Sequence, residues 1–178
     1  VVLGPRDACR RSTGDEDGVL GQADRLARFL QSLAGPVTVV ADGLAGAAAA
    51  AAWGLVEPLD QRLFRFPYSD LAILGKFATR GPHWRAAGWV MHVVNGAVAG
   101  LVFWALFERF GGNAFWFAIA FAMIEHLVTY PLTLLTDRFH PARGAPELPP
   151  MARSGRAFAQ ATFRHLLFGV VLGLLVSI

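Results

Sequence analysis

The sequence predicts an all-α, polytopic membrane protein, and two observations carry this prediction. Four long apolar stretches each have about the 20 residues that an α-helix needs to cross a hydrocarbon layer of about 30 Å. Hydrophobic residues make up 54% of the chain and charged residues 16%, against roughly 45–50% and about 25% in soluble globular proteins. We therefore expect a bundle of four transmembrane helices in the cell membrane, with spans at about 36–56, 86–107, 113–135 and 157–178.

The N-terminal region is predicted to consist of two different segments. Residues 1–20 are polar and predict a flexible tail without the apolar stretch of a secretory signal peptide, followed by a single membrane domain over 21–178. Within 21–33 the apolar side chains share one helical face, which predicts a short amphipathic helix on the membrane surface. Gly35 and Pro36 are expected to separate it from the first span. The alternative is that 21–33 is the solvated start of that span.

The first span is rich in Ala and Gly, which let helix backbones approach closely. We therefore expect this helix to be surrounded by protein rather than by lipid. Polar, small and aromatic residues recur in it at intervals of three or four, so they share one helical face. These residues are Asp42, Gly46, Ala49, Trp53 and Glu57.

The connection 58–85 is the longest between predicted spans and is too apolar for a free loop. Ser69 and Asp70 are predicted to cap a short helix over 71–79. We expect an interfacial or re-entrant cap segment over the mouth of the bundle, ended by Gly81 and Pro82.

The remaining spans carry signals for packing and distortion. A connection of only 108–112 predicts that the second and third spans form an antiparallel hairpin. Pro131 is expected to kink the third span. Residues 137–156 are polar and rich in proline and predict a surface loop. Two GxxxG spacings predict close helix packing: Gly96 with Gly100, and Gly169 with Gly173.

Polar side chains of different spans are predicted to gather at a similar depth. Because the helices alternate in direction, 58–85 and 137–156 lie on the same side of the bundle. At about 1.5 Å per residue, His92 lies roughly 9 Å, His126 roughly 15 Å and Arg164 roughly 12 Å below that side. The predicted ligand-binding residues are Glu57, His92, Asn95, Glu125, His126, Tyr130, Arg164 and His165.

Glu125 and Arg164 are predicted to pair inside the bundle, together with His92 or His165. A charged side chain at the centre of a span costs about 2.5–3.5 kcal/mol, so neither residue is expected to face lipid. The alternative is that this pair, with hydrogen bonds between His92 and Asn95, only locks the helices together.

Two classes of function follow from this arrangement. Apolar walls with a few convergent polar groups favour a pocket for a lipophilic small molecule, with Glu125 and His126 as candidate catalytic acid or base. Whether the protein is an enzyme stays open. The competing hypothesis is a non-enzymatic accessory or assembly subunit of a larger membrane complex, with a membrane protein or a second copy of the chain as partner. A channel or transporter is a third hypothesis.

The identity of a cofactor is not predicted. His92, His126 and His165 are candidate ligands for Zn²⁺ or non-haem iron, and two opposed histidines are able to hold haem. However, HxxxH, HExxH and HxxE patterns are absent, and adjacent Glu125 and His126 point about 100° apart on a helix. Nucleic-acid binding is not expected, because the basic residues are spread over connecting loops.

The distribution of basic residues predicts the orientation. Of the 16 Lys and Arg, ten lie on the side of 58–85 and 137–156, through Arg164. By the positive-inside rule, both loops are expected in the cytoplasm.

The stretch EHLVTYPLTLLTDRFHPARG, followed by RAFAQATFRHLLFGVVLG, resembles uncharacterised small four-span integral membrane proteins of actinobacteria. The resemblance covers roughly residues 36–175 and implies a host of that kind, but no activity. Its most distinctive positions are Glu125, His126, Asp137, Arg138, His140, Arg164 and His165.

Overall fold

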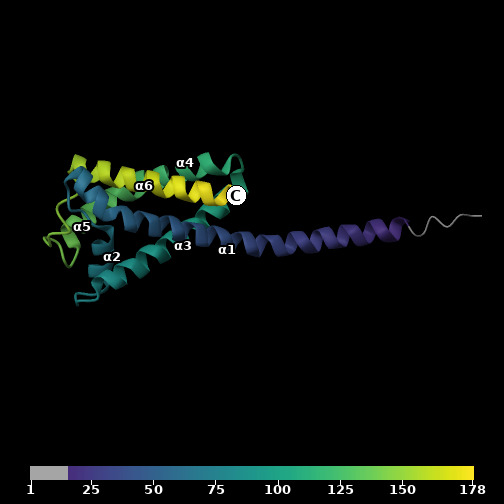
Figure 1. Cartoon of the computed structure of the whole chain (residues 1–178), viewed down its shortest axis with the longest axis horizontal. Helices are drawn as coiled ribbons and strands as arrows, with labels where there is room; N and C mark the ends of the chain where they lie inside the picture. Colours follow the sequence, from purple (N-terminus) through teal and green to yellow (C-terminus); the bar gives the residue numbers. More distant parts are fainter. Residues whose placement is uncertain (1–15) are drawn as a thin grey trace, which may run out of the picture. The chain divides into compact units, whose positions relative to one another are not determined.

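The predicted all-α fold is confirmed by the computed structural model, which describes the backbone of residues 16–178 and the side chains from Val37 onward. The chain divides into two units at Val37, and all packing described below belongs to the second unit, Thr38–Ile178. Over residues 16–178 the elements are all helices (Figure 1). They are α1 (Glu16–Phe64), α2 (Asp70–Ala78), α3 (Trp84–Phe110), α4 (Ala114–Thr129), the 3₁₀ turn η1 (Tyr130–Leu132), α5 (Thr133–Phe139) and α6 (Gly155–Val176).

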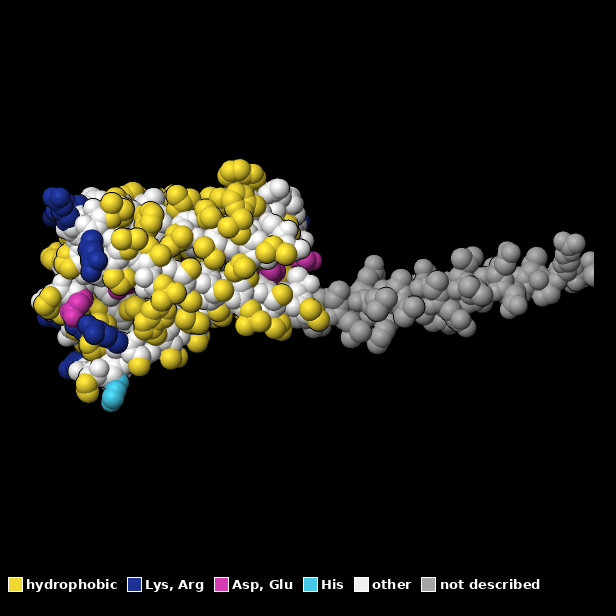
Figure 2. Space-filling model, in the orientation of Figure 1, with side chains coloured by type: hydrophobic (Ala, Val, Ile, Leu, Met, Phe, Trp, Pro, Cys, Tyr) yellow, Lys and Arg dark blue, Asp and Glu magenta, His cyan; other side chains and the backbone are white. Residues whose placement is uncertain are grey.

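Within residues 16–178, four helical stretches are long and apolar enough to cross a membrane. They are Val37–Phe64, Trp84–Phe110, Ala114–Phe139 and Gly155–Val176. Large apolar side chains are spread over the visible surface of the unit (Figure 2), as expected for a protein surrounded by lipid. The four predicted spans are confirmed, and the chain is a multi-pass integral membrane protein.

Helix α1 differs from the sequence prediction at both ends. It includes Gly35 and Pro36, so the predicted break between a surface helix and the first span is wrong. A proline removes one backbone donor, which membrane helices tolerate. The helix also continues to Phe64, two turns past the predicted end of the span. The side chains of the predicted amphipathic face and residues 1–15 of the predicted tail lie outside the described residues.

The predicted polar and small face of α1 is buried against the bundle. Asp42, Gly46, Ala49, Trp53 and Glu57 are all buried, as their spacing predicts. The same spacing continues to Asp60, which is fully buried.

Close packing of α1 on α3 depends on glycine. A Cβ atom at Gly100 would overlap the carbonyl oxygen of Asp42, and one at Gly46 would overlap that of Gly96. Helix α6 packs along α4 in the same way, because a Cβ at Gly169 or Gly173 would press on the α4 backbone. Both predicted GxxxG packing faces are therefore confirmed.

The predicted helix in the cap segment is confirmed. Ser69 is the N-cap of α2, and its hydroxyl oxygen accepts from the backbone N–H of Ala72 at 3.0 Å. Helix α2 packs along α3. Near Pro131, the predicted kink appears as η1, which separates α4 from α5.

The loop between α5 and α6 packs on the cap, so the two predicted loops lie on the same side. Ser69 donates its backbone N–H to the Glu147 carbonyl at 3.2 Å, and Lys76 pairs with the Glu147 carboxylate at 2.6 Å. Leu148 and Met151 are buried, so this loop is more than the surface connection that its composition predicts.

Candidate functional site

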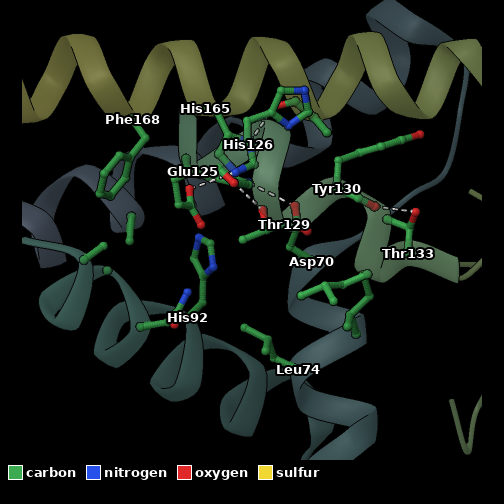
Figure 3. Close-up of a pocket in the computed structure, with 18 of the residues that line it drawn as sticks. Asp70, Leu74, His92, Glu125, His126, Thr129, Tyr130, Thr133, His165 and Phe168 are labelled. Carbon is green, nitrogen blue, oxygen red and sulfur yellow. Dashed lines mark hydrogen bonds and ion pairs between the residues drawn. The ribbon is translucent and has the colours of Figure 1, made fainter. Parts of the chain in front are cut away.

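A cavity of about 350 Å³ lies inside the bundle. It takes side chains from α1 through α6, and Figure 3 shows His92 on α3 facing the side chains of α4 and α6. Helices α3 and α4 diverge from their short connection (Figure 1), which leaves room between them. The volume of the cavity is within the range of roughly 300–1,000 Å³ that is usual for small-molecule pockets.

Most residues of the predicted site line this cavity. Six of the eight do so, and Glu57 and Arg164 lie behind the wall. The six are His92, Asn95, Glu125, His126, Tyr130 and His165.

Arg164 is fully buried and is bound by carboxylates of α1 and of the start of α2. Its Nε and Nη2 donate to Asp60, with Nη2 to Oδ1 at 2.6 Å, and its Nη1 donates to Asp70. Nη2 also donates to the Tyr68 carbonyl at 3.0 Å, and the guanidinium lies 4.7 Å from the centre of the Tyr68 ring. The predicted pair of Glu125 with Arg164 is therefore wrong. The physical reason is that Asp60 and Asp70 lie at the depth of Arg164 and occupy the donors of its guanidinium group.

Glu57 links this cluster to the start of α2. Its carboxylate accepts from the Ser69 hydroxyl and from the backbone N–H of Asp70 at 3.1 Å, and lies 3.6 Å from Arg164 Nη1. A carboxylate at a helix N-terminus is stabilised by the free N–H groups there. Three carboxylates thus face one guanidinium, which leaves an excess of acidic groups beside the cavity.

Asp70 connects the Arg164 cluster to the cavity wall. Burial acts to raise the pKa of Asp70, but the charge of Arg164 and the hydrogen bond from the Tyr68 hydroxyl outweigh burial, so its pKa lies below the ordinary value. Burial, and then the charge of Asp70, raise the pKa of Tyr68 well above its usual range. Tyr68 therefore stays protonated as a donor, and Asp70 is an anion at neutral pH.

Glu125 pairs with His165 instead of Arg164. Its Oε2 lies 3.1 Å from His165 Nε2, while His165 Nδ1 lies 2.7 Å from the carbonyl oxygen of Ala161. Because a carbonyl oxygen only accepts, Nδ1 of His165 carries a hydrogen. A hydrogen bond between Nε2 and Glu125 then needs a second proton, either on Nε2 or on the carboxyl group. The two side chains therefore share one proton at the cavity wall.

His126 presents a lone pair at a buried nitrogen. Its Nε2 lies 2.9 Å from the Thr162 hydroxyl, which donates its one hydrogen to the Phe158 carbonyl at 2.8 Å. The hydroxyl oxygen therefore accepts from Nε2–H, and Nδ1 of the neutral ring is unprotonated. This Nδ1 is buried and finds no hydrogen-bond partner within the described part of the chain.

His92 is the histidine on the opposite side of the cavity. Its Nε2 is also buried without a hydrogen-bond partner among the side chains from Val37 onward. The ring interacts with the Ala50 carbonyl through its other nitrogen, so Nε2 of the neutral ring bears a lone pair. The Trp53 ring packs against both histidines, with its centre 5.2 Å from that of His92 and 4.7 Å from that of His165, and its Nε1 donates to Asp70 at 3.2 Å.

This arrangement does not assemble the three candidate metal ligands. In the described residues no group of three or more His, Cys, Asp or Glu side chains is placed to hold a metal ion. His126 and His165 lie near one another, with ring centres 4.7 Å apart, whereas His92 and His165 each pack against the Trp53 ring. The proposed haem ligation stays a prediction.

Two important site residues were not in the predicted set. Asp60 lies three residues after Glu57 on the same face of α1, a spacing that counts only because the helix continues past the predicted end of the span. Asp70 was identified only as a helix cap, and its contact with Arg164, 94 residues away, has no local signal.

Comparison of the chain with protein-family models, with curated proteins and with solved structures gives no match. The resemblance to small four-span actinobacterial proteins stays a prediction.

Proposed function

We propose that this integral membrane protein binds a lipophilic small molecule in the cavity between α3 and the α4–α6 pair. The observation that carries the proposal is a cavity of about 350 Å³ with apolar walls and a few convergent polar groups. Leu74, Ala99 and Phe168 supply apolar surface, while Glu125 and His92 supply polar atoms. This is the usual composition of small-molecule sites.

The unpartnered imidazole nitrogen of His92 adds support. A buried polar atom without a partner costs roughly 1–3 kcal/mol, which a hydrogen bond from a ligand would offset. If the ligand is also a substrate, the proton shared by Glu125 and His165 is the group that would exchange with it. His126, the other candidate acid or base, also lines the cavity and is fully buried.

Filling the cavity tests the proposal. Native mass spectrometry of the protein released from lipid nanodiscs is expected to show a small molecule bound to the unaltered chain. Ala99→Phe places a ring in the cavity and is expected to abolish this adduct. Ala105→Phe, on the exposed face of the same helix, is the matched control and is expected to retain it. Equal adducts in both variants would contradict the proposal.

The accessory-subunit hypothesis loses part of its support. Within the chain itself, the Ala and Gly face of α1 packs on the GxxxG face of α3, and the GxxxG face of α6 packs on α4. A partner is therefore not needed to explain these small-residue faces. A membrane protein partner or a second copy stays a prediction, tested by the protein composition of the natively purified sample.

We further infer that the loops around α2 and between α5 and α6 face the cytoplasm. Lys and Arg gather at this end of the unit on the face shown in Figure 2. The positive-inside rule supports this orientation.

A further inference from the structure

We propose that the ligand is a lipophilic amine, bound as the ammonium ion with its N–H groups donated to Glu125 and His92. This assignment rests on the proposed function, since it names the class of molecule that the cavity takes. It follows from an inventory of the donors, acceptors and charges at the wall.

Three hydroxyl groups of the wall, one each on α4, η1 and α5, have already donated their protons to the backbone. Thr129 donates to the Glu125 carbonyl at 2.8 Å, Thr133 to the Tyr130 carbonyl at 2.7 Å, and Tyr130 to the Met151 carbonyl at 3.0 Å. A hydroxyl has one hydrogen, so each of these groups offers only lone pairs to a ligand.

Three ionisable side chains at the wall, Glu125, Asp70 and His92, offer lone pairs as well. The carboxylate of Glu125 is the more accessible, with 35% of its side chain exposed, against 17% for Asp70. His92 is 95% buried, and its unpartnered Nε2 bears a lone pair. Figure 3 shows the His92 ring pointing across the cavity toward Glu125. The side-chain donors left at the described wall are the Asn95 amide and the Thr136 hydroxyl.

The charges around the cavity favour a cation. Asp60 and Asp70 pair with the single charge of Arg164 and leave one negative charge in excess, and Glu57 is a third acidic group beside them. The Glu125–His165 pair shares one proton and adds no net charge. Buried carboxylates in excess of cations are costly, because charge is poorly solvated inside a protein. An ammonium ion in the cavity would reduce this excess.

The aromatic residues fit the same class of ligand. Trp53 lines the cavity, and the face of an indole ring attracts ammonium groups. Leu74, Ala99 and Phe168 lie on the wall as apolar surface for the body of the ligand. An acidic and aromatic site for the head group beside an apolar wall is therefore matched to an amine with an alkyl or aryl tail.

Three probes with the same tail test the proposal: decylamine, decanol and decanoate. Each is titrated at neutral pH into the full chain in zwitterionic nanodiscs, and occupancy is measured by native mass spectrometry. We expect decylamine to bind roughly tenfold tighter than decanol, because its hydrogen bonds are charge-assisted, and decanoate to bind weakest. Decanoate or decanol binding as tightly as decylamine would overturn the assignment. This ranking tests it in the unaltered chain, independently of whether any variant folds.

A pair of variants then locates the preference. Glu125→Gln is expected to weaken decylamine binding roughly tenfold and to leave decanol binding nearly unchanged. Glu108→Gln, on the exposed face near the far end of α3, is expected to change neither. An unchanged preference in Glu125→Gln would overturn the assignment.

The two proposals fail in different ways. If decanol or decanoate binds and Ala99→Phe abolishes that binding, while decylamine shows no advantage, the cavity binds ligands but the amine assignment is wrong. If none of the probes gives binding that Ala99→Phe abolishes, and no native adduct is found, the proposed function itself is wrong.

Discussion

At the scale of single residues, Arg164 links three helices in the interior of the bundle. It is fully buried and binds Asp60 of α1 and Asp70 of α2 from its own position on α6. A buried ion pair contributes little net stability compared with apolar packing, but removal of one partner leaves an uncompensated charge. Arg164 therefore determines which helices pack together, and its substitution is expected to destabilise the protein strongly.

Arg164→Gln is expected to lower the free energy of unfolding by about 3–5 kcal/mol, because Asp60 keeps a buried charge without its partner. Adding Asp60→Asn is expected to recover part of this loss. The measurement is reversible unfolding in mixed detergent micelles. Arg109→Gln, at an exposed position, is the control. Losses that simply add for Asp60 and Arg164 would show that the two side chains do not interact.

The same experiment distinguishes the true partner from the predicted one. Glu125 binds His165 and does not contact Arg164, so the losses from Glu125→Gln and Arg164→Gln are expected to add within about 0.5 kcal/mol. A coupling energy between Glu125 and Arg164 as large as that between Asp60 and Arg164 would instead support the pair predicted from the sequence.

Asp70 predicts how stability depends on pH. Its pKa is lowered in the folded protein, so its pairing with Arg164 contributes fully above the unfolded pKa of about 3.9 and is lost as the pH falls through the lower, folded pKa. The difference in Tm between the unaltered chain and Asp70→Asn is expected to be constant from pH 7 to about pH 5 and to shrink below about pH 4. Thermal unfolding in a non-ionic detergent measures it. A difference that grows on acidification would contradict this assignment.

At the scale of elements, the small residues of α1 and α3 set the distance between the helices and thereby one wall of the cavity. Gly96 lines the cavity, and Gly100 lies one turn further along α3 against the backbone of Asp42. Wider side chains there would move α3 away from α1. Helix packing and cavity shape are thus coupled through a few Cβ positions.

Gly100→Ala is expected to destabilise the protein by about 1–3 kcal/mol, because the new methyl group overlaps backbone atoms that cannot rotate away. Gly155→Ala is the matched control, since a Cβ at Gly155 meets nothing within 4 Å. Its Tm is expected to stay the same or to rise slightly, as alanine favours a helix. Equal effects of the two substitutions would show that α1 and α3 are not in close contact.

At the scale of the whole molecule, the inferred orientation is open to a direct test. Single cysteines replace Arg143, in the loop before α6, and Arg109, at the far end of α3, in a Cys9→Ser background. In intact cells, a membrane-impermeant maleimide is expected to label the cysteine at 109 and not the one at 143, while lysed cells label both. The reverse pattern in intact cells would invert the inferred orientation.

The sequence predicts most of the architecture because its signals are local. Apolar length sets the spans, Ser69 sets the start of α2, and glycine spacing sets the packing faces. The cavity was anticipated for the same reason, since most of its polar residues lie on recognisable faces of the spans. The partner of Arg164 was not, because depth along a helix does not determine rotation about it. The apolar stretch also ends before Glu57, so apolar length does not predict that α1 continues to Asp60.

The pairing of Arg164 with Asp60 has a consequence for how the chain is made. The two residues are 104 positions apart, one in the first helix to be synthesised and the other in the last. Asp60 therefore enters the membrane well before its guanidinium partner exists. Until α6 is inserted, the unfinished chain carries an uncompensated acid at membrane depth. A chain truncated before α6 lacks the guanidinium that pairs with Asp60, so its carboxyl group has to stay hydrated or protonated.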